Sequence, residues 1–570
     1  MELVTQSIQS ASNQRPKPAD FKPSYGTAGF RSRADRLCVI VLHAVSPHAR
    51  TPLTPSPPHL LAPARPFRSS TVFRCGILMA LRSLKTHKTT GICITASHNP
   101  APDNGVKLVE GDGSMLLQEY EGLADEMANA ETTEALVEVV KRCIEAEGIN
   151  VTAPSTGTAK VLLAYDTRPS GISLAEDAAA GISSLGVSVE ILGVLTTPQL
   201  HWAVMRRNRG LPSSEAAYYK HIADAFGVLT GGPLNRKLHV DCANGVGALK
   251  LEQLKPYVAP LGMEFCLHNV GDGVLNGDCG SDFIQKEKTL PETMRGIPAG
   301  EAACAVDGDA DRLVYFYSPA SDSPPSQAPP VNIALLDGDK IAALVAGLFR
   351  TLVAALPGPL PTSTSIGVVQ TAYANGSSTA YLTDELNCKV VVTPTGVKHL
   401  HKAAHQFDIG IYFEANGHGT VLFRSAFLDA LREVREASAP AREILALNDV
   451  INEAVGDAIS DILLVETALM KRGMNLPQWN ALYRDLPSRQ LKAEVHDRTA
   501  IVTEDAERRV ARPKKLQDAI DAIVADYPGS RSFVRPSGTE DIVRIYAEAA
   551  DERAVDELAA RVRQAVLEEV

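Results

Sequence analysis

Three aspartates spaced two residues apart place a dense negative charge directly after an apolar stretch of the chain. They are Asp307, Asp309 and Asp311, in the run DGDADR that follows residues 302–306. Carboxylates this close repel one another unless a cation offsets their charge. Oxygen ligands suit Mg²⁺, which takes few carboxylates and keeps positions for water or phosphate oxygens. The spacing therefore predicts a site for one Mg²⁺ ion per chain.

An EF-hand calcium loop also begins with acidic residues at this spacing, but it requires Gly at its sixth position and Glu at its twelfth. Those positions are Arg312 and Ser318 here, so the calcium interpretation is rejected. A solvated acidic turn remains the alternative to a metal site.

Ser97 stands in the run TASHNP, after the apolar residues 91–94 and before Pro100. A serine in a tight turn at a strand end is exposed and well placed as a nucleophile. It has neither a G-x-S-x-G elbow nor an Asp-His triad order around it. Phosphorylation is another way in which this serine could take part in catalysis, because the phosphate oxygens could coordinate the metal held by the aspartates. The alternative is a turn serine that caps the next helix.

Two later loops have the composition of ligand sites. In RPSGTED, Arg535 can hold a phosphate by two parallel hydrogen bonds, and hydroxyls with a glycine turn complete an anion nest. In FEANGHG, Glu414 and Asn416 can hydrogen-bond neighbouring sugar hydroxyls. Basic residues in four smaller loops would offset phosphate charge or act as general acid or base: Arg31, Lys107, Arg168 and Lys398.

Composition narrows the class of protein. The chain has 570 residues, enough for about three to five domains, and a net charge of −11. That charge argues against a general nucleic-acid binder but allows a small cationic pocket for an anion. No stretch approaches a membrane span, and the nine cysteines form no C-x-x-C pair. We therefore expect a cytoplasmic protein with free thiols.

Short apolar runs recur, each followed by a polar loop rich in Gly, Asp or Asn and then by a helical stretch. The runs are residues 91–94, 161–165, 238–240, 302–306, 366–369, 409–413 and 532–534. Continuous apolar runs fit strands that are buried on both faces of a parallel sheet, and alternation with helices predicts α/β domains. Ligands bind at the carboxyl ends of such strands, so these loops are expected to converge on one cleft.

Residues 38–69 do not fit this pattern. They hold seven prolines and no acidic residue. Prolines exclude a regular helix or a central strand. The segment is predicted to be an anomalous surface insertion, or else a stretch outside the genuine coding sequence such as a retained intron.

Taken together, the motifs TASHNP, DNGVK, DGDADR, FEANGHG and RPSGTED resemble the α-D-phosphohexomutase superfamily, and their particular forms look most like phosphoacetylglucosamine mutases. The resemblance implies four domains around a central cleft: three similar α/β domains and a smaller C-terminal α+β domain. The predicted divisions are 1–200 with the phosphoserine loop, 201–330 with the metal loop, 331–446 with the sugar loop, and 447–570 with the phosphate loop.

The resemblance also implies roles for the residues. Ser97 would be the phosphoserine and a metal ligand beside the three aspartates, and Lys107 and Arg31 would be catalytic. The residues implied to bind substrate are Glu414, Ala415, Asn416, Lys398, Arg535, Pro536, Ser537, Gly538, Thr539 and Arg544.

The implied reaction interconverts N-acetylglucosamine 6-phosphate and N-acetylglucosamine 1-phosphate through a bisphosphate, on the route to UDP-N-acetylglucosamine. A hexosamine 1,6-bisphosphate would act as activator, and the protein would be a monomer or weak homodimer with no nucleic-acid or membrane partner. The alternatives are a phosphoglucomutase or phosphomannomutase, a sugar-phosphate-binding scaffold without activity, and a metal-dependent phosphatase.

Overall fold

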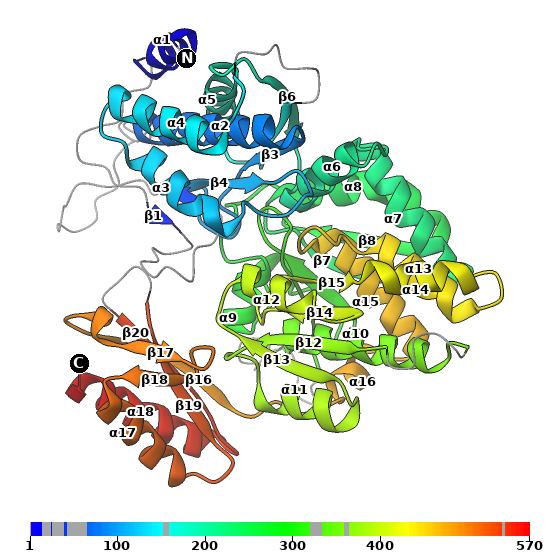
Figure 1. Cartoon of the computed structure of the whole chain (residues 1–570). Helices are drawn as coiled ribbons and strands as arrows, with labels where there is room; N and C mark the ends of the chain where they lie inside the picture. Colours follow the sequence, from blue (N-terminus) through cyan, green and yellow to red (C-terminus); the bar gives the residue numbers. More distant parts are fainter. Residues whose placement is uncertain are drawn as a thin grey trace.

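The computed structural model describes residues 2–13, 24–25, 39–42, 65–151, 159–319, 333–357, 364–537 and 542–569. Three of the predicted site residues, Arg31, Gly538 and Thr539, lie outside these ranges. Figure 1 shows three sheets with their helices grouped around the middle of the molecule, and a fourth, orange to red, standing apart.

The first sheet is six-stranded in the order β1-β2-β4-β3-β5-β6. Its strands are β1 (Ser24–Tyr25), β2 (Val39–Leu42), β3 (Thr89–Ile94), β4 (Asn104–Val109), β5 (Lys160–Tyr165) and β6 (Ser188–Val194). β3, β5 and β6 are parallel, whereas β4 runs antiparallel between β3 and β2. The loop that joins β3 to β4 carries Ser97, and β4 itself carries Lys107.

Helices cover both faces of this sheet. One face packs on a core with α2 and α5, and the other packs on the apolar residues of α6. The helices are α1 (Glu2–Asn13), α2 (Arg65–Thr86), α3 (Glu121–Asn129), α4 (Thr133–Glu147), α5 (Gly171–Ser183) and α6 (Thr197–Asn208). β3 is buried at every residue, which is why its sequence is continuously apolar or small rather than alternating.

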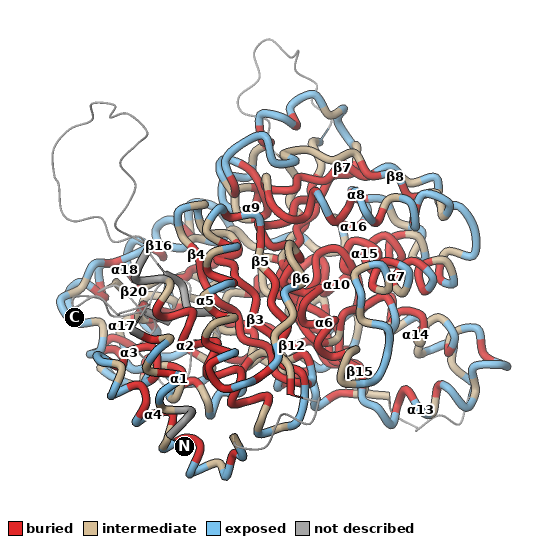
Figure 2. The backbone as a smooth tube through the Cα atoms, turned by 90° about the horizontal axis from the view of Figure 1, so that it is seen from above, coloured by how far each residue is buried: buried red, intermediate tan, exposed pale blue. Residues whose placement is uncertain are grey.

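The second and third sheets share one hydrophobic core. In Figure 2, α10 and α15 are largely red, the colour of buried residues. Their orders are β11-β10-β9-β7-β8 and β13-β12-β14-β15. The strands are β7 (Arg236–Asp241), β8 (Met263–His268), β9 (Ala303–Val306), β10 (Leu313–Tyr317), β11 (Ala334–Leu336), β12 (Ile366–Thr371), β13 (Lys389–Thr393), β14 (Ile409–Phe413) and β15 (Gly419–Phe423).

The helices between residues 215 and 480 accompany these two sheets along the chain. They are α7 (Glu215–Thr230), α8 (Val246–Val258), α9 (Ser281–Glu287), α10 (Gly338–Ala354), α11 (Gly376–Ala380), α12 (Val397–Ala404), α13 (Ser425–Val434), α14 (Ala439–Val450), α15 (Ala458–Arg472) and α16 (Leu476–Asn480). Of these, α7, α8, α10 and α15 pack in the shared core. α10 begins where the Asp337 side chain accepts hydrogen bonds from the amides of Asp339 and Lys340.

The fourth sheet is antiparallel, in the order β16-β20-β19, and has its own small core with the last helices. The elements of this C-terminal unit are β16 (Ser488–Glu494), β17 (Val502–Glu504) and β18 (Arg509–Arg512), α17 (Lys514–Ala525), β19 (Arg531–Pro536), β20 (Ile542–Glu548) and α18 (Glu552–Glu569), of which β17 and β18 pair as a separate two-stranded sheet. The predicted α/β class and the smaller C-terminal α+β unit are confirmed.

All seven predicted strands are present, but the expected helix after each polar loop is wrong in four places. β3, β9, β14 and β19 are each followed by an antiparallel partner strand: β4, β10, β15 and β20. The reason is that only five to nine residues separate the two strands of each pair, too few for the crossover that a parallel neighbour requires.

The prediction that residues 38–69 hold no helix or central strand is wrong at both ends. β2 lies between β1 and β4, and α2 begins at Arg65. The first proline of the segment, Pro47, comes after β2 has ended, and Pro66 stands in the first turn of α2, where a missing N–H costs nothing. Residues 43–64 lie outside the described ranges.

The predicted domain divisions stay a prediction. Two of them fall inside helices, the one after residue 200 in α6 and the one after residue 446 in α14. Within the described ranges, no helix is both long enough and apolar enough to cross a membrane.

Candidate active site

The three predicted metal ligands meet in the turn between β9 and β10. One oxygen from each of Asp307, Asp309 and Asp311 lies within 4.8 Å of the others, and all three residues are buried. The turn is held by Asp307 Oδ1, which accepts hydrogen bonds from the amides of Asp311 (3.0 Å) and Arg312 (3.2 Å). The chain therefore brings three buried carboxylates together at one turn.

The donor set fits a hard cation. Asp307 Oδ2, Asp309 Oδ1 and Asp311 Oδ1 are buried oxygens that have no hydrogen-bond partner among the described residues. Leaving such atoms unpaired is costly, so a ligand is expected to satisfy them. Burial and the neighbouring carboxylates raise the pKa of Asp307, so a cation that offset their negative charge would be favoured here. Carboxylate oxygens are the ligands that Mg²⁺ prefers.

Lys107 approaches the same carboxylates from β4. Its Nζ lies 2.7 Å from Asp309 Oδ2 and 2.6 Å from Asp311 Oδ2. Burial would lower the pKa of Lys107, but the charges of Asp309 and Asp311 outweigh burial and raise it. The side chain is therefore an ammonium that joins the first sheet to the metal loop of the second.

Ser97 lies against the metal loop, as its predicted role requires. Its Oγ is 3.1 Å from Asp309 Oδ2, and the residue is 7% exposed. The backbone of Ser97 has φ 48°, a left-handed conformation that costs energy in a non-glycine residue. Its amide donates to Thr95 Oγ1 at 3.0 Å, so the first residue after β3 helps to fix the turn.

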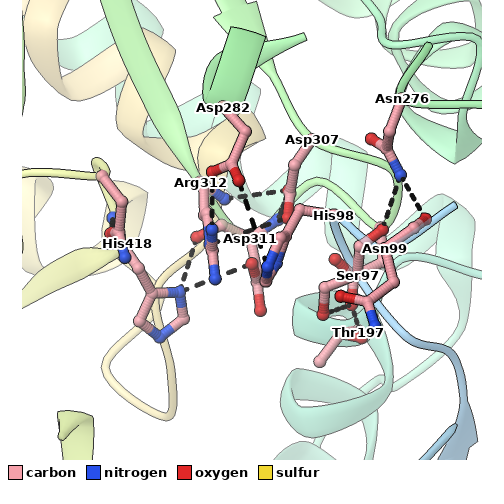
Figure 3. Close-up of polar contacts among 12 residues, drawn as sticks. Ser97, His98, Asn99, Thr197, Asn276, Asp282, Asp307, Asp311, Arg312 and His418 are labelled. Atoms are coloured by element: carbon pink, nitrogen blue, oxygen red, sulfur yellow. Dashed lines mark hydrogen bonds and ion pairs between the residues drawn. The ribbon is translucent and has the colours of Figure 1, made fainter. Parts of the chain in front are cut away.

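Two side chains clamp the serine turn by its carbonyl oxygens. Arg168 Nη2 donates to the carbonyls of Ser97 (3.1 Å) and Asn99 (2.7 Å). Asn276 Nδ2 donates to the same two oxygens at 2.9 and 3.1 Å, as Figure 3 shows. Because Arg168 follows β5 and Asn276 follows β8, two sheets hold the loop in place.

Thr197 was missed by the sequence reasoning. Its Oγ1 donates to Asp309 Oδ2 at 2.6 Å from the first turn of α6. In the sequence it is one threonine beside another, and Thr196 is the one that caps the helix. Nothing in the pattern of residue types distinguishes Thr197 from a helix-start residue.

Histidines complete the surroundings of the aspartates. His418 Nδ1 lies 2.7 Å from the carbonyl oxygen of Asp311, and His98 Nε2 lies 4.0 Å from Asp282 Oδ2. Burial, together with the Arg312 charge, lowers the pKa of His98 to about 3, so its imidazole is neutral. Arg312 itself pairs with Asp282 at 2.8 Å (Figure 3).

The predicted sugar loop packs directly on the metal loop. The amide of Leu313 donates to the carbonyl oxygen of Gly417 at 3.2 Å, and a Cβ on Gly417 would lie 1.8 Å from Leu313 O. Glu414, Ala415 and Asn416 are half-buried in the turn between β14 and β15. The structure therefore brings this loop to the aspartates, while its role toward a sugar stays a prediction.

The predicted phosphate loop lies on the fourth sheet. Arg535 and Arg544 are opposite each other on β19 and β20. Arg535 is buried and donates from Nε to Glu507 at 2.7 Å, and Glu507 in turn accepts from Thr395 of the third sheet's unit. Pro536 and Ser537 continue β19 toward the residues outside the described ranges. Figure 1 shows this C-terminal sheet standing apart from the other three.

Lys398, at the start of α12, contacts the first sheet's unit. Its Nζ donates to the carbonyl of Leu116 at 2.7 Å and forms an ion pair with Glu121. Its predicted contact with substrate stays a prediction, and Arg31, Gly538 and Thr539 lie outside the described residues.

Comparison with protein families gives matches along most of the chain. The model of phosphoacetylglucosamine mutase AMG1, domain III, matches residues 337–474. The phosphoglucomutase/phosphomannomutase models match residues 77–134 and 121–213 for the alpha/beta/alpha domain I, and 492–565 for the C-terminal domain. Each match falls on one of the sheets described above.

Whole-length relatives agree. The phosphoacetylglucosamine mutase of Arabidopsis thaliana is 44% identical over 99% of this chain and 98% of its own length. The human phosphoacetylglucosamine mutase is 42% identical over 97% of this chain and 95% of its own. 

Solved structures agree as well. The Aspergillus fumigatus N-acetylphosphoglucosamine mutase in complex with GlcNAc-6P and magnesium is 37% identical, covers 100% of this chain and 99% of its own, and has a TM-score of 0.86. A variant of that enzyme in complex with glucose 1,6-bisphosphate has a TM-score of 0.84. With full-length relatives of this similarity and a serine set against a buried aspartate triplet, the chain belongs to the phosphoacetylglucosamine mutase family.

Proposed function

We propose that this chain interconverts N-acetylglucosamine 6-phosphate and N-acetylglucosamine 1-phosphate by carrying a phosphoryl group on Ser97. The observation that carries the proposal is the placement of Ser97 Oγ 3.1 Å from Asp309, beside three buried carboxylate oxygens that have no hydrogen-bond partner among the described residues. A plain turn serine would not require a strained backbone, two side-chain clamps and a buried acidic neighbour.

The proposed reaction has two transfers. The phosphoryl group on Ser97 passes to the 1-hydroxyl of the 6-phosphate, giving the 1,6-bisphosphate and a free serine hydroxyl. The bisphosphate then turns over, and its 6-phosphoryl group returns to Ser97, leaving the 1-phosphate. Phosphoryl transfer of this kind depends on in-line placement and neutralised charge rather than on covalent protein chemistry.

Mg²⁺, when bound by Asp307, Asp309 and Asp311 with Ser97, would supply positive charge that offsets the charge of the transferring phosphoryl group. The chain's own residues place the serine: Arg168 and Asn276 hold its carbonyl oxygen, and Thr95 holds its amide. This clamping fixes the position of Oγ before substrate binds. A rigid scaffold lowers the reaction barrier in this way, because the entropy of positioning the reacting groups has already been lost.

Lys107 is proposed as the proton donor. Its neighbours Asp309 and Asp311 raise its pKa, so it holds a proton close to the serine oxygen that departs in the first transfer. In the second transfer the same amine would take the proton back from the serine hydroxyl, as microscopic reversibility requires. Arg31 remains a second proposed catalytic residue on the strength of its motif alone.

Substrate contacts are proposed from two loops. Glu414, Ala415 and Asn416 would bind the sugar, since their turn packs on the metal loop. Arg535 and Arg544, with Pro536, Ser537, Gly538 and Thr539, would hold the phosphate that is not reacting, because two arginines face each other across β19 and β20. Lys398 would contribute positive charge from the start of α12.

We also infer that the protein acts in the cytoplasm, on the route to UDP-N-acetylglucosamine. It would be a monomer or weak homodimer, with a hexosamine 1,6-bisphosphate as activator. The free thiols of the described cysteines fit a reducing compartment. We propose domain divisions near residues 200, 330 and 446. The last division falls inside α14, and both α14 and α15 pack in the core shared by the second and third sheets.

The test is a coupled assay for N-acetylglucosamine 1-phosphate with Mg²⁺ and trace bisphosphate, run beside glucose and mannose phosphates. Asp309→Asn should abolish activity and weaken Mg²⁺ binding, whereas Asp272→Asn, at an exposed aspartate of the same unit, should change neither. Activity only on glucose or mannose phosphates would favour the other hexose mutases. Phosphate release without isomerisation would favour a phosphatase, and binding without turnover would favour a scaffold.

A further inference from the structure

A pair of histidines on α12 has no part in the proposed reaction. His401 and His405 are four residues apart, so they lie on one face of the helix and its last turn. Their Nε2 atoms are 3.2 Å apart, and the two rings meet edge to face with centroids separated by 4.9 Å. His405 is exposed, so solvent reaches the point where the two nitrogens meet.

The spacing of the two nitrogens matches the bite of one ion. Zinc binds imidazole nitrogen at about 2.0–2.1 Å, which puts two ligands of a tetrahedral centre about 3.3 Å apart. Two histidines at this spacing on a helix also form half of the ligand set of many zinc enzymes. The pair is therefore set to chelate with little movement of either side chain.

The inner histidine is oriented from behind. His401 Nδ1 lies 3.0 Å from the hydroxyl of Tyr412, a fully buried residue of β14. If Nδ1–H donates to this oxygen, the lone pair of Nε2 points at His405. A hydrogen bond from the non-ligating ring nitrogen is the usual support of a metal-binding histidine, because it fixes both tautomer and ring orientation.

The lowered pKa of His401 also keeps its nitrogen free of a proton, as a metal ligand requires. Burial and the neighbouring His405 lower the pKa of His401 to about 4, so protons do not compete for its nitrogen near neutral pH. The charge of Asp112, an exposed residue of the first sheet's unit, acts on His401 in the opposite sense and would attract a cation to the pair.

We propose that His401 and His405 form a second metal site, which takes a divalent transition ion of the Zn²⁺, Ni²⁺ or Cu²⁺ class through two imidazole nitrogens. Water would complete the coordination. Imidazole selects such ions and not Mg²⁺, so the site is chemically separate from the aspartate cluster. It does not depend on the proposed mutase reaction.

The test uses the full, untagged chain with Zn²⁺ in equilibrium dialysis, in excess Mg²⁺. The unaltered chain should bind one more Zn²⁺ than His405→Ala, and His496→Ala, which removes an exposed histidine of the fourth sheet's unit, should match the unaltered chain. Circular dichroism would check that His405→Ala is folded. Equal Zn²⁺ binding by the unaltered chain and His405→Ala would overturn the proposal.

A second readout identifies the ligands. Electron paramagnetic resonance of bound Cu²⁺ should show coupling to two imidazole nitrogens in the unaltered chain and in His496→Ala. The same coupling should drop to one or none in His405→Ala. A spectrum that is unchanged by His405→Ala would place the ion elsewhere and reject the site, even if the chain binds copper tightly.

Discussion

The carbonyl oxygen of Ser97 occupies the space that a side chain on Gly308 would need. A Cβ built on Gly308 would lie 2.5 Å from Ser97 O and 2.8 Å from Asn276 Nδ2, the atom that clamps that oxygen. The serine loop of the first sheet and the metal loop of the second therefore meet backbone to backbone. Only glycine permits this approach, because any Cβ would push the two loops apart.

Gly308→Ala should therefore reduce the mutase activity about 100-fold or more, since a displacement of about 1 Å at a reacting group costs that much. The cause would be misplacement of Ser97 relative to the aspartates rather than unfolding. Steady-state kinetics and a thermal melt, measured on the same preparation, separate the two.

Gly122→Ala is the matched control, because a Cβ on Gly122 in α3 meets nothing within 4 Å. It should keep full activity and be slightly more stable, as expected for alanine in a helix. Equal activity of the two variants would show that the approach of the loops is not needed for catalysis.

Thr197→Val removes a hydroxyl that donates to Asp309 Oδ2 at 2.6 Å while keeping the shape of the side chain. A hydrogen bond to a charged group contributes about 1.5–3 kcal/mol, so kcat/KM should fall roughly ten- to hundredfold. Thr197→Ser should restore most of the activity, because it returns the donor. No recovery in the serine variant would mean that the methyl group, not the hydrogen bond, matters.

Arg535→Lys tests the phosphate grip. Lysine keeps the charge but loses the planar, two-pronged geometry, so KM for the sugar phosphate should rise about tenfold with a smaller change in kcat. Arg509→Lys, at an exposed arginine paired with Asp521 on the same unit, is the control and should leave KM unchanged. A fall in kcat with constant KM would instead mean that Arg535 stabilises the transition state rather than the bound substrate.

His201 makes stability depend on pH. Burial lowers the pKa of His201 to about 4 in the folded chain, whereas the ordinary histidine pKa of 6.5 applies in the unfolded chain. The unfolded chain therefore binds a proton at a pH where the folded chain does not. A lowered histidine pKa leaves stability unaffected above about 6.5 and reduces it as pH falls toward 4.

Between about pH 7.5 and 5.5 this histidine should account for a loss of about 1 kcal/mol in the free energy of unfolding. His201→Asn cannot titrate, so its stability should fall less over the same interval in urea titrations, whatever its absolute value. Parallel curves for the two proteins would contradict the assignment to His201.

The sequence predicted the parts of the site that are encoded as short runs. The aspartate triplet, Ser97 and Lys107 each stand in a polar loop or strand next to an apolar run, and the structure brings all of them together. The strands themselves were predicted because burial on both faces leaves a continuous apolar signal, as in β3.

What the sequence did not predict depends on contacts between distant segments. Thr197 meets Asp309 over 112 residues, and Asn276 meets Ser97 over 179. No local periodicity encodes such a pairing. The antiparallel partners β4, β10, β15 and β20 were also missed, because a strand after a tight polar turn has no signal that separates it from the start of a helix.

The most direct test of the central claim is to follow the phosphoryl group on Ser97. The chain would be incubated with hexosamine 1,6-bisphosphate, freed of excess ligand, and analysed by intact mass and peptide sequencing before and after addition of N-acetylglucosamine 6-phosphate with Mg²⁺. The account predicts one phosphoryl group on Ser97 that leaves when the sugar phosphate is added, and none on Ser97→Ala. A fully active chain that never carries phosphate at Ser97 would contradict it.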